Sequence, residues 1–276
     1  MCPDRPQELV PQSTVRAVIY RGLLASAHAL HKAGNACLAA AAGFLRRDEL
    51  QAVSIGQHRL FALSPLEVDA GLSPGEARFY GKFLRDGERV LLVGCGSGRD
   101  LLALLSRGYQ VTGLDPLAEV VELARAHLAR RGMSAPVLAG FIQTAELGGP
   151  YDAVIFSNGC YCFLQGVDVR VATLIRTATH LAPHGRIIVS YYPAGRQSRF
   201  GRWLTRASAR IGSADWVPEP GDTFSRDALQ PALVRYHHAF EPQELARECE
   251  SAGLRMLADE HCEEGCRFAA AAPVER

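Results

Sequence analysis

The feature of this chain that most clearly suggests chemistry is a loop with three glycines at alternate positions. The apolar run Val90–Val93 leads directly into Gly94, Gly96 and Gly98, and a helical pattern follows. Glycines at this spacing let the backbone turn sharply and approach a ligand closely, and free amides at a helix start attract a carboxylate. We therefore expect a nucleotide-like ligand with a carboxylate here, also contacted by Cys95, Ser97 and Asp100.

An acidic residue ends the next predicted strand. The run 110–114 is followed by Asp115 and Pro116. An acid at this point can accept hydrogen bonds from both hydroxyls of a ribose, as in dinucleotide-binding folds. The alternative is that Asp115 caps the helix that starts after Pro116, and the two roles are compatible. We expect Asp115 to bind the ribose of the ligand.

Two adjacent histidines, His237 and His238, precede the segment Phe240-Glu241-Pro242. Imidazole titrates near neutral pH, so either ring can act as a general base for a hydroxyl or amine nucleophile. Neighbouring side chains on an extended segment point to opposite faces, so at most one should face a site. A surface or structural role is the alternative for each.

The eight cysteines do not resemble a disulfide-dense secreted scaffold. Two pairs, Cys160 with Cys162 and Cys262 with Cys266, raise the possibility of a metal or thiophilic site. Neither pair has the Cys-x-x-Cys spacing that is common in zinc sites. We expect ordinary buried cysteines and no metal.

The elements that must position these residues follow from the periodicity after residue 86. Short β-branched runs alternate with helical patterns there, which predicts an α/β fold with a doubly wound, mostly parallel seven-stranded sheet and a closing antiparallel hairpin. The predicted strands are 89–93, 110–114, 135–139, 153–156, 185–191, 256–262 and 267–272. The predicted helices of this part are 100–106, 118–131, 169–181 and 242–252.

The chain divides into an N-terminal helical extension, residues 1–84, and an α/β domain, residues 85–276, with an insertion at about 194–235 that lacks a clear period. Two helices, separated near Gly34-Asn35, are expected between residues 13 and 50, and a helix capped by Ser73 follows. The extension is expected to form a partial lid over the site. The alternatives are that the extension forms a dimer interface or covers one face of the sheet.

The charge balance argues against a nucleic-acid partner or an acidic membrane, because 30 Lys and Arg residues face 29 Asp and Glu residues. A small-molecule or peptide substrate is expected instead. The start of the chain lacks a basic segment followed by an apolar one, so a cytoplasmic location is expected. Residues 9–47 contain no acid, as in a transit peptide, but Asp4 and Glu8 precede them.

The order of motifs resembles the class I S-adenosylmethionine-dependent methyltransferase family. The matching segments are Val93 to Asp100, Gly113 to Pro116, Tyr151 to Ile155 and Leu181 to Arg186. The resemblance extends over roughly residues 87–271. It implies S-adenosylmethionine as cofactor, S-adenosylhomocysteine as product, and an enzyme that transfers a methyl group.

The resemblance also implies roles for residues after later strands. The adenine is expected near Phe141 and Ile142, where the family often has an acid. The fourth strand of the family ends at the transferred methyl group, which places Ser157 and Asn158 there, with Asn158 contacting the amino-acid end of the cofactor or the substrate. The candidate substrate contacts are Cys160, Tyr161, Tyr191, Tyr192 and Phe224, and Tyr161 can equally be a catalytic, substrate-orienting hydroxyl or a packed aromatic ring.

The sequence thus predicts methyl transfer to a small-molecule or peptide nucleophile, with an O, N, S or C acceptor atom left open. A noncatalytic subunit that binds the cofactor is one alternative, and a homodimer is possible. A nicotinamide-dependent oxidoreductase is the other, but its loop requires Gly-x-Gly-x-x-Gly, and Arg99 follows Gly98.

Overall fold

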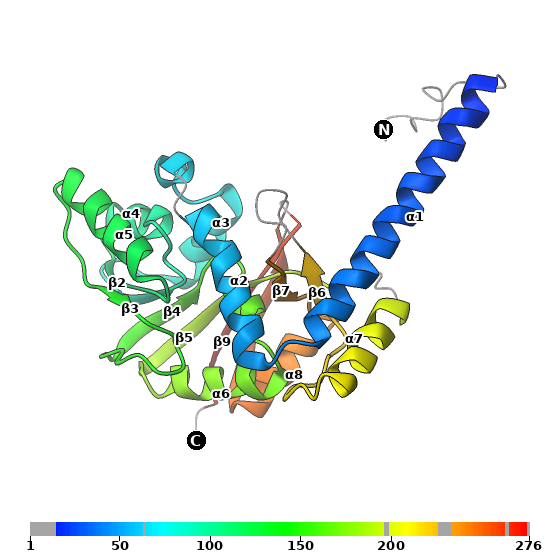
Figure 1. Cartoon of the computed structure of the whole chain (residues 1–276). Coiled ribbons are helices and arrows are strands. Elements are labelled where there is room, and N and C mark those ends of the chain that lie inside the picture. Colours follow the sequence, from blue (N-terminus) through cyan, green and yellow to red (C-terminus); the bar gives the residue numbers. More distant parts are fainter. Residues whose placement is uncertain (1–14, 63–64, 196–198, 226–232, 263–264, 275–276) are drawn as a thin grey trace, which may run out of the picture.

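A computed structural model of the chain describes residues 15–62, 65–195, 199–225, 233–262 and 265–274. A seven-stranded sheet with strand order β3-β2-β1-β4-β5-β9-β8 forms its centre (Figure 1). The strands are β1 Arg89–Val93, β2 Gln110–Asp115, β3 Val137–Ala139, β4 Tyr151–Phe156, β5 Leu181–Tyr191, β8 Leu254–His261 and β9 Arg267–Pro273. Helices α4 Arg99–Leu105, α5 Ala118–Arg130, α6 Val167–Ala178 and α8 Glu244–Ser251 complete the domain, together with the short 3-10 helix η3 Cys160–Phe163.

The central strands are apolar on both faces because helices cover both faces of the sheet. In β1, Val90 and Leu92 belong to one core cluster and Leu91 and Val93 to the other. Strand β1 pairs in parallel with β2 and β4, whereas β9 pairs antiparallel with β5 and β8. The predicted fold, a doubly wound sheet with a closing antiparallel hairpin, is confirmed.

The N-terminal region differs from the prediction. One continuous helix, α1 Val15–Gly43, runs through Gly34-Asn35, and a second helix, α2 Arg47–Ala62, follows after a short turn. One glycine costs a helix only about 1 kcal/mol relative to alanine, and the surrounding alanines favour helix, so the expected break does not occur. The 3-10 helix η2 Pro65–Ala70 and α3 Pro74–Phe83 come next, and Ser73 caps α3 as predicted.

The insertion is more regular than its sequence indicated. Its described parts contain α7 Arg199–Ile211 and β6 Asp222–Ser225, and β6 pairs antiparallel with β7 Arg235–His238. Helix α7 packs against the C-terminal half of α1, which extends away from the sheet domain (Figure 1). In the described parts of the chain, length and hydropathy together exclude a membrane crossing for every helix.

Candidate functional site

The glycine loop lies at the carboxyl end of β1, between that strand and α4. Gly94, Gly96 and Gly98 have φ values of 73°, 54° and 106°, in the left-handed region that favours glycine. The amide of Gly94 donates to the carbonyl of Leu114 at 2.8 Å, which ties the loop to β2. A Cβ atom on Gly94 would lie 2.8 Å from the Cβ of Cys160, so a larger residue would force the two loops apart.

Asp115 holds this loop in place. Its Oδ2 accepts a hydrogen bond from the Gly96 amide and its Oδ1 accepts one from the Leu117 amide, each at 3.0 Å. Burial raises the pKa of the carboxyl group, and the two amides partly offset this effect. Each carboxylate oxygen has a second lone pair, so Asp115 can still accept hydrogen bonds from a ligand.

A cavity of about 510 Å³ opens beside the loop. Its volume lies in the range of sites for small ligands and cofactors. Of the predicted cofactor-binding residues, Gly98 does not line this cavity. Those that do are Gly94, Cys95, Gly96, Ser97, Asp100, Asp115, Pro116, Phe141, Ile142, Ser157 and Asn158.

A second part of the lining comes from the N-terminal extension, which the sequence predicts as a partial lid, and from residues that no sequence motif marks. Helix α2 contributes Arg47, Leu50, Gln51, Ser54, Ile55 and His58. Phe163, Leu164, Gln165, Val169 and Tyr236 also belong to this part, whereas Gln143 lines the cavity from the loop after β3. The spacing of the α2 residues is that of one helix face, and this is the only sequence signal that could have marked them as a group.

Several cavity-lining side chains have buried polar atoms without a partner among the described residues. These atoms are Arg47 Nε, His58 Nε2, Asp100 Oδ2, Gln143 Oε1, and Gln165 Nε2 and Oε1. A buried polar group without a hydrogen bond costs about 1–3 kcal/mol. The atoms therefore identify the parts of the wall where a polar ligand would be stabilised.

His58 lies on the α2 wall with its ring edge-on against Phe163, at 4.1 Å between ring centroids. Burial, together with the nearby Arg235 and His237, lowers the pKa of His58 to about 4. The imidazole is therefore neutral near pH 7. Its unpaired Nε2 can accept a hydrogen bond.

Arg99 connects the glycine loop to α3 through two close ion pairs. Its Nη2 lies 2.6 Å from Glu76 Oε1 and its Nε lies 2.6 Å from Asp100 Oδ1. These contacts use one oxygen of Asp100 and leave Oδ2 unpaired. The cavity edge thus presents a guanidinium and a carboxylate side by side.

Most of the predicted substrate contacts lie outside the cavity, and only Cys160 lines it. Tyr161 is fully buried and its hydroxyl donates to Glu248 at 3.0 Å, because η3 turns this side chain back into the core. The hydroxyl of Tyr191 donates to Asp259 at 2.8 Å. Phe224 packs against Trp216 and Tyr236, and Tyr192 contacts the ring of His237. The structure thus places Tyr161, Tyr191, Tyr192 and Phe224 outside the cavity lining.

The histidine pair also lies outside the cavity lining. His238 is fully buried, and its Nδ1 and Nε2 lie 2.9 Å from Asp222 and 3.0 Å from Glu244. Burial alone lowers the pKa of His238, but these carboxylates outweigh it and raise the pKa to about 9. With both ring nitrogens engaged and the ring protonated, His238 is not available as a base for a ligand in the cavity.

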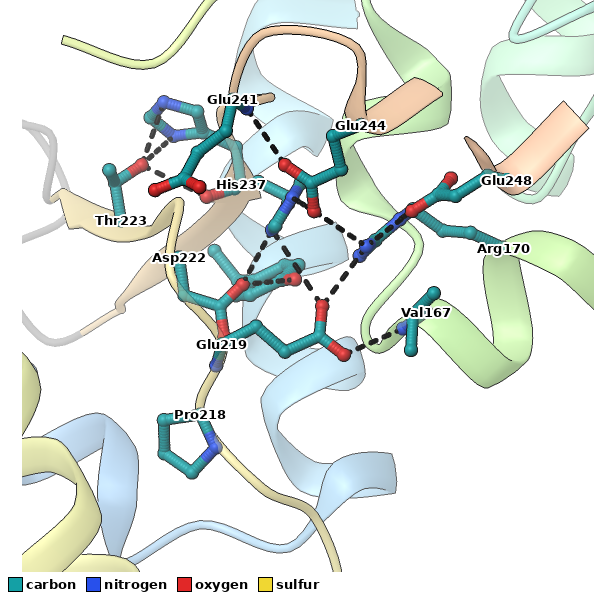
Figure 2. A network of polar contacts seen from close by, with 12 residues as sticks. Val167, Arg170, Pro218, Glu219, Asp222, Thr223, His237, Glu241, Glu244 and Glu248 are labelled. Carbon is teal, nitrogen blue, oxygen red and sulfur yellow. Dashed lines mark hydrogen bonds and ion pairs between the residues drawn. The ribbon is translucent and has the colours of Figure 1, made fainter. Parts of the chain in front are cut away.

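His237 points to the other side of β7, as strand alternation predicts, and contacts Thr223 (Figure 2). Burial lowers its pKa to about 4, and Arg235 and His238 contribute to the shift. The structure therefore does not bring either histidine to the cavity wall.

His238 belongs to a buried network of charges around Arg170, which it joins through Asp222 and Glu244. Figure 2 shows Arg170 of this network beside Glu244 and Glu248. Arg170 is fully buried on α6, and its Nη2 lies 2.7 Å from Glu248, 3.0 Å from Glu219 and 3.6 Å from Glu244. Asp222 also accepts a hydrogen bond from Tyr236 Oη at 2.8 Å. Tyr236 lines the cavity, so the network supports the cavity wall from behind.

Two of the described cysteines line the cavity. These are Cys95 and Cys160, and burial raises the pKa of the Cys95 thiol far above its usual value. Cys262 and Cys266 have thiols 2.8 Å apart but are not part of the cavity lining. Among the residues that the structure describes, no three cysteine thiols lie close enough together to hold a metal ion.

The sequence of residues 90–185 matches a family model described as a methyltransferase domain. The chain is 28% identical over 205 residues to the ubiquinone biosynthesis O-methyltransferase of Xanthomonas axonopodis pv. citri, covering 72% of this chain and 73% of that protein. It is 30% identical over 140 residues to the protein-L-isoaspartate O-methyltransferase of Methylorubrum extorquens, covering 49% and 55% of the two chains.

Solved structures share the fold at lower sequence identity. A SAM-dependent methyltransferase from Methanosarcina mazei aligns with a TM-score of 0.57 and 19% identity, over 74% of this chain and all of that chain. The 1,6-didemethyltoxoflavin-N1-methyltransferase of Burkholderia thailandensis, solved with its substrate and S-adenosylhomocysteine, aligns with a TM-score of 0.55 and 18% identity, over 81% and 85%. At these sequence identities, the similarity to solved structures shows a shared fold and no more.

Proposed function

This chain is a class I S-adenosylmethionine-dependent methyltransferase, and from this premise we propose that it methylates a small organic acceptor held beside the cofactor. The observation that carries the proposal is the cavity itself. One wall is the glycine loop with Asp115, and the other is α2 with η3 and Tyr236. A cavity enclosed in this way can bring a small acceptor next to a bound cofactor.

The residues of the first wall fit S-adenosylmethionine. Asp115 has free lone pairs for the ribose hydroxyls, and the unpaired Asp100 Oδ2 can accept from the ammonium group of the cofactor. Gln143 Oε1 lies on the loop after β3 and can accept from the adenine amino group. The expected acid is missing at Gly140-Phe141-Ile142, and Gln143 supplies an acceptor one position later.

The bound cofactor would supply a methyl group on a positively charged sulfur, which is already activated for displacement. The protein then has to align a nucleophile with that methyl group and exclude water. The proposed partial lid, α2, serves both purposes because its side chains form the wall that faces the loop.

The acceptor side of the cavity combines an apolar surface with few polar groups. Leu50, Ile55 and Phe163 can contact an apolar body, while His58 Nε2 and the amide of Gln165 can orient a hydroxyl or amine. We assign to neutral His58 the role of accepting the acceptor's proton, in place of His237 and His238. The curated relatives described above are O-methyltransferases, which makes an oxygen nucleophile the first acceptor to test.

The first experiment measures cofactor binding by isothermal titration calorimetry with S-adenosylhomocysteine. We expect Asp115→Asn to weaken binding by about 10- to 100-fold, since two hydrogen bonds to a charged group are lost or weakened. Asp86→Asn is the matched control, because Asp86 is exposed and does not line the cavity. The proposal fails if the intact chain does not bind S-adenosylhomocysteine.

The second experiment identifies the acceptor. The protein is incubated with methyl-labelled S-adenosylmethionine and a whole-cell extract of the host, and labelled products are identified by mass. A labelled product below the size of a peptide supports the proposal. Label found only in protein would overturn the small-molecule assignment and leave cofactor binding unaffected.

A further inference from the structure

Helix α7 exposes an apolar face that takes no part in the cavity. Phe200, Trp203 and Ile211 are 61%, 60% and 76% exposed, and their spacing puts them on one side of the helix. The rings of Phe200 and Trp203 stack at 6.0 Å between centroids. A surface helix normally turns its apolar face towards the core, so α7 has the reverse orientation.

The opposite face of α7 explains this orientation. It carries the small buried side chains of Thr205, Ser208 and Ala209. A Cβ atom on Gly43 of α1 would collide with Ser208 Oγ, so the two helix backbones approach closely there. Close packing of small residues on α1 thus fixes α7 with its aromatic side chains outward.

Positive charge borders the apolar face. Arg202, Arg206 and Arg210 repeat every four residues and form a stripe along α7, and the sequence of α7 contains no acid. Helix α1 contains Arg16, Arg21 and Lys32 and also no acid. The whole chain has a formal net charge of only +1, so positive charge is concentrated on this helix pair.

Helix α1 also exposes apolar side chains. Val15, Val18, Leu23 and Leu30 are 77%, 72%, 66% and 73% exposed. The helix extends beyond the sheet domain, with α7 beside its C-terminal half (Figure 1). Because α1 holds α7 with its aromatic side chains outward, we call Phe200, Trp203, Ile211 and the three arginines of α7 together the helix-pair surface.

We propose that the helix-pair surface binds the surface of a bilayer that contains anionic lipids. An amphipathic helix with aromatic residues on one face and arginines beside them lies in the plane of such an interface. Phe200, Trp203 and Ile211 enter the boundary between headgroups and acyl chains, and the arginines contact lipid phosphates. The binding is peripheral, since none of the described helices can cross a membrane.

Charge favours a bilayer over a second copy of the chain. A twofold dimer would place the same surface of both copies face to face, and neither helix supplies an acid to pair with the opposing arginines. A nucleic acid would pair with the arginines but would leave Ile211 and the other apolar side chains of α7 exposed. An anionic bilayer satisfies both the charges and the apolar side chains.

The test is sedimentation of the full chain with vesicles at about 0.1 M salt, where charges interact over about 10 Å. Vesicles of phosphatidylcholine alone are compared with vesicles in which about one-third of the lipid is phosphatidylglycerol. We expect at least about tenfold tighter binding to the anionic vesicles, weakened by added salt. Trp203 should shift its fluorescence to shorter wavelength on binding, whereas the other tryptophan, Trp216, is only 5% exposed.

Two variants test the apolar and the charged parts separately. Phe200→Ser with Trp203→Ser should reduce vesicle binding about tenfold or more and abolish the fluorescence shift. Arg206→Gln with Arg210→Gln should reduce binding to the anionic vesicles by a similar factor and lower its salt dependence. Ile175→Ser is the matched control, because Ile175 is 48% exposed on α6, and it should bind as the unchanged chain does.

The proposal is overturned if the chain binds neither type of vesicle, or both equally. It is also overturned if analytical ultracentrifugation shows a dimer that Phe200→Ser with Trp203→Ser dissociates while vesicle binding is absent. Unchanged thermal unfolding of the variants establishes that lost binding does not reflect lost folding. None of these outcomes depends on cofactor binding or on the acceptor, so this proposal can fail independently of the proposed function.

Discussion

His58 and His238 have the same side chain but opposite protonation states at neutral pH. Burial and nearby positive charge lower the pKa of His58 to about 4, whereas two carboxylates raise that of His238 to about 9 against the effect of burial. A base must be unprotonated and must have an open lone pair. At the residue scale, therefore, His58 meets both requirements for a general base, a role that the sequence suggested for His237 or His238.

The first prediction concerns His58→Phe, which keeps an aromatic ring against Phe163 but removes Nε2. We expect kcat with the identified acceptor to fall about 100-fold, the lower range for loss of general base catalysis. The affinity for S-adenosylhomocysteine should stay within about twofold, because His58 is assigned to the acceptor side. Steady-state kinetics and calorimetry measure the two quantities.

His28→Phe is the matched control, since His28 is exposed on α1 and does not line the cavity. Full activity of His58→Phe would contradict the assignment. A parallel loss of cofactor affinity and turnover would contradict it as well, because it would indicate a structural role.

At the element scale, α2 joins a distant part of the sequence to the cavity. Arg47 and His58 mark the ends of its lining face, and the glycine loop lies on the other side of the cavity. A lid that closes on a ligand should open less often when the ligand is bound. We predict that S-adenosylhomocysteine slows amide hydrogen exchange in residues 47–58 by about tenfold.

Hydrogen exchange followed by mass spectrometry checks this prediction peptide by peptide. Residues 20–30 of α1 are the internal control, since they do not line the cavity and should exchange at the same rate with and without the ligand. Slowed exchange that is confined to the glycine loop would contradict a lid function for α2.

The Arg170 network ties the β6–β7 hairpin to α6 and α8, so it supports an element rather than a single residue. Arg170→Met leaves Glu219, Glu244 and Glu248 without their buried cation. Removing one partner of a buried ion pair costs about 3–5 kcal/mol, so we predict a loss of that size in the free energy of unfolding. Urea unfolding measures the change.

Arg125→Met is the matched control, because Arg125 is also on a helix and pairs with Glu122 at the surface. Exposed ion pairs contribute about 0–1 kcal/mol, so this variant should unfold almost as the original chain does. Equal losses in the two variants would show that the buried network has no special role in stability.

Local sequence patterns are sufficient to predict the sheet domain. The apolar run of β1, the glycines after it and Asp115 lie within 30 residues, and each pattern is set by near neighbours in the chain. The cavity wall on α2 depends instead on packing between residues that are far apart in sequence, such as His58 and Phe163. No periodicity within a single element could predict such a contact.

Helix α7 shows a different limit of prediction. Phe200, Trp203 and Ile211 have helical spacing, but the arginines, glycines and serines around them obscured it. The charge totals also hide local differences, because 30 basic and 29 acidic residues nearly cancel although α1 and α7 together carry seven basic residues and no acid. A sum over the chain cannot reveal how charge is distributed on its surface.

At the scale of the whole molecule, the shifted histidines should give stability a maximum near pH 6.5. The folded-state pKa values of His58 and His237, about 4, lie below the ordinary 6.5, so folding is disfavoured as pH falls below 6.5. The folded-state pKa of His238, about 9, lies above it. The contribution of His238 to the free energy of unfolding is therefore complete below pH 6.5 and is lost as pH rises through 9.

The last prediction isolates His238 between pH 7 and 8, below the ordinary pKa of cysteine, about 8.5, and of tyrosine, about 10. The free energy of unfolding should fall by about 1 kcal/mol across this window, since the unfolded chain releases its proton first. Urea unfolding at each pH should show this slope in the original chain and in His28→Gln, and a nearly flat line in His238→Gln. An unchanged slope in His238→Gln would mean that the buried carboxylates do not hold a protonated imidazole.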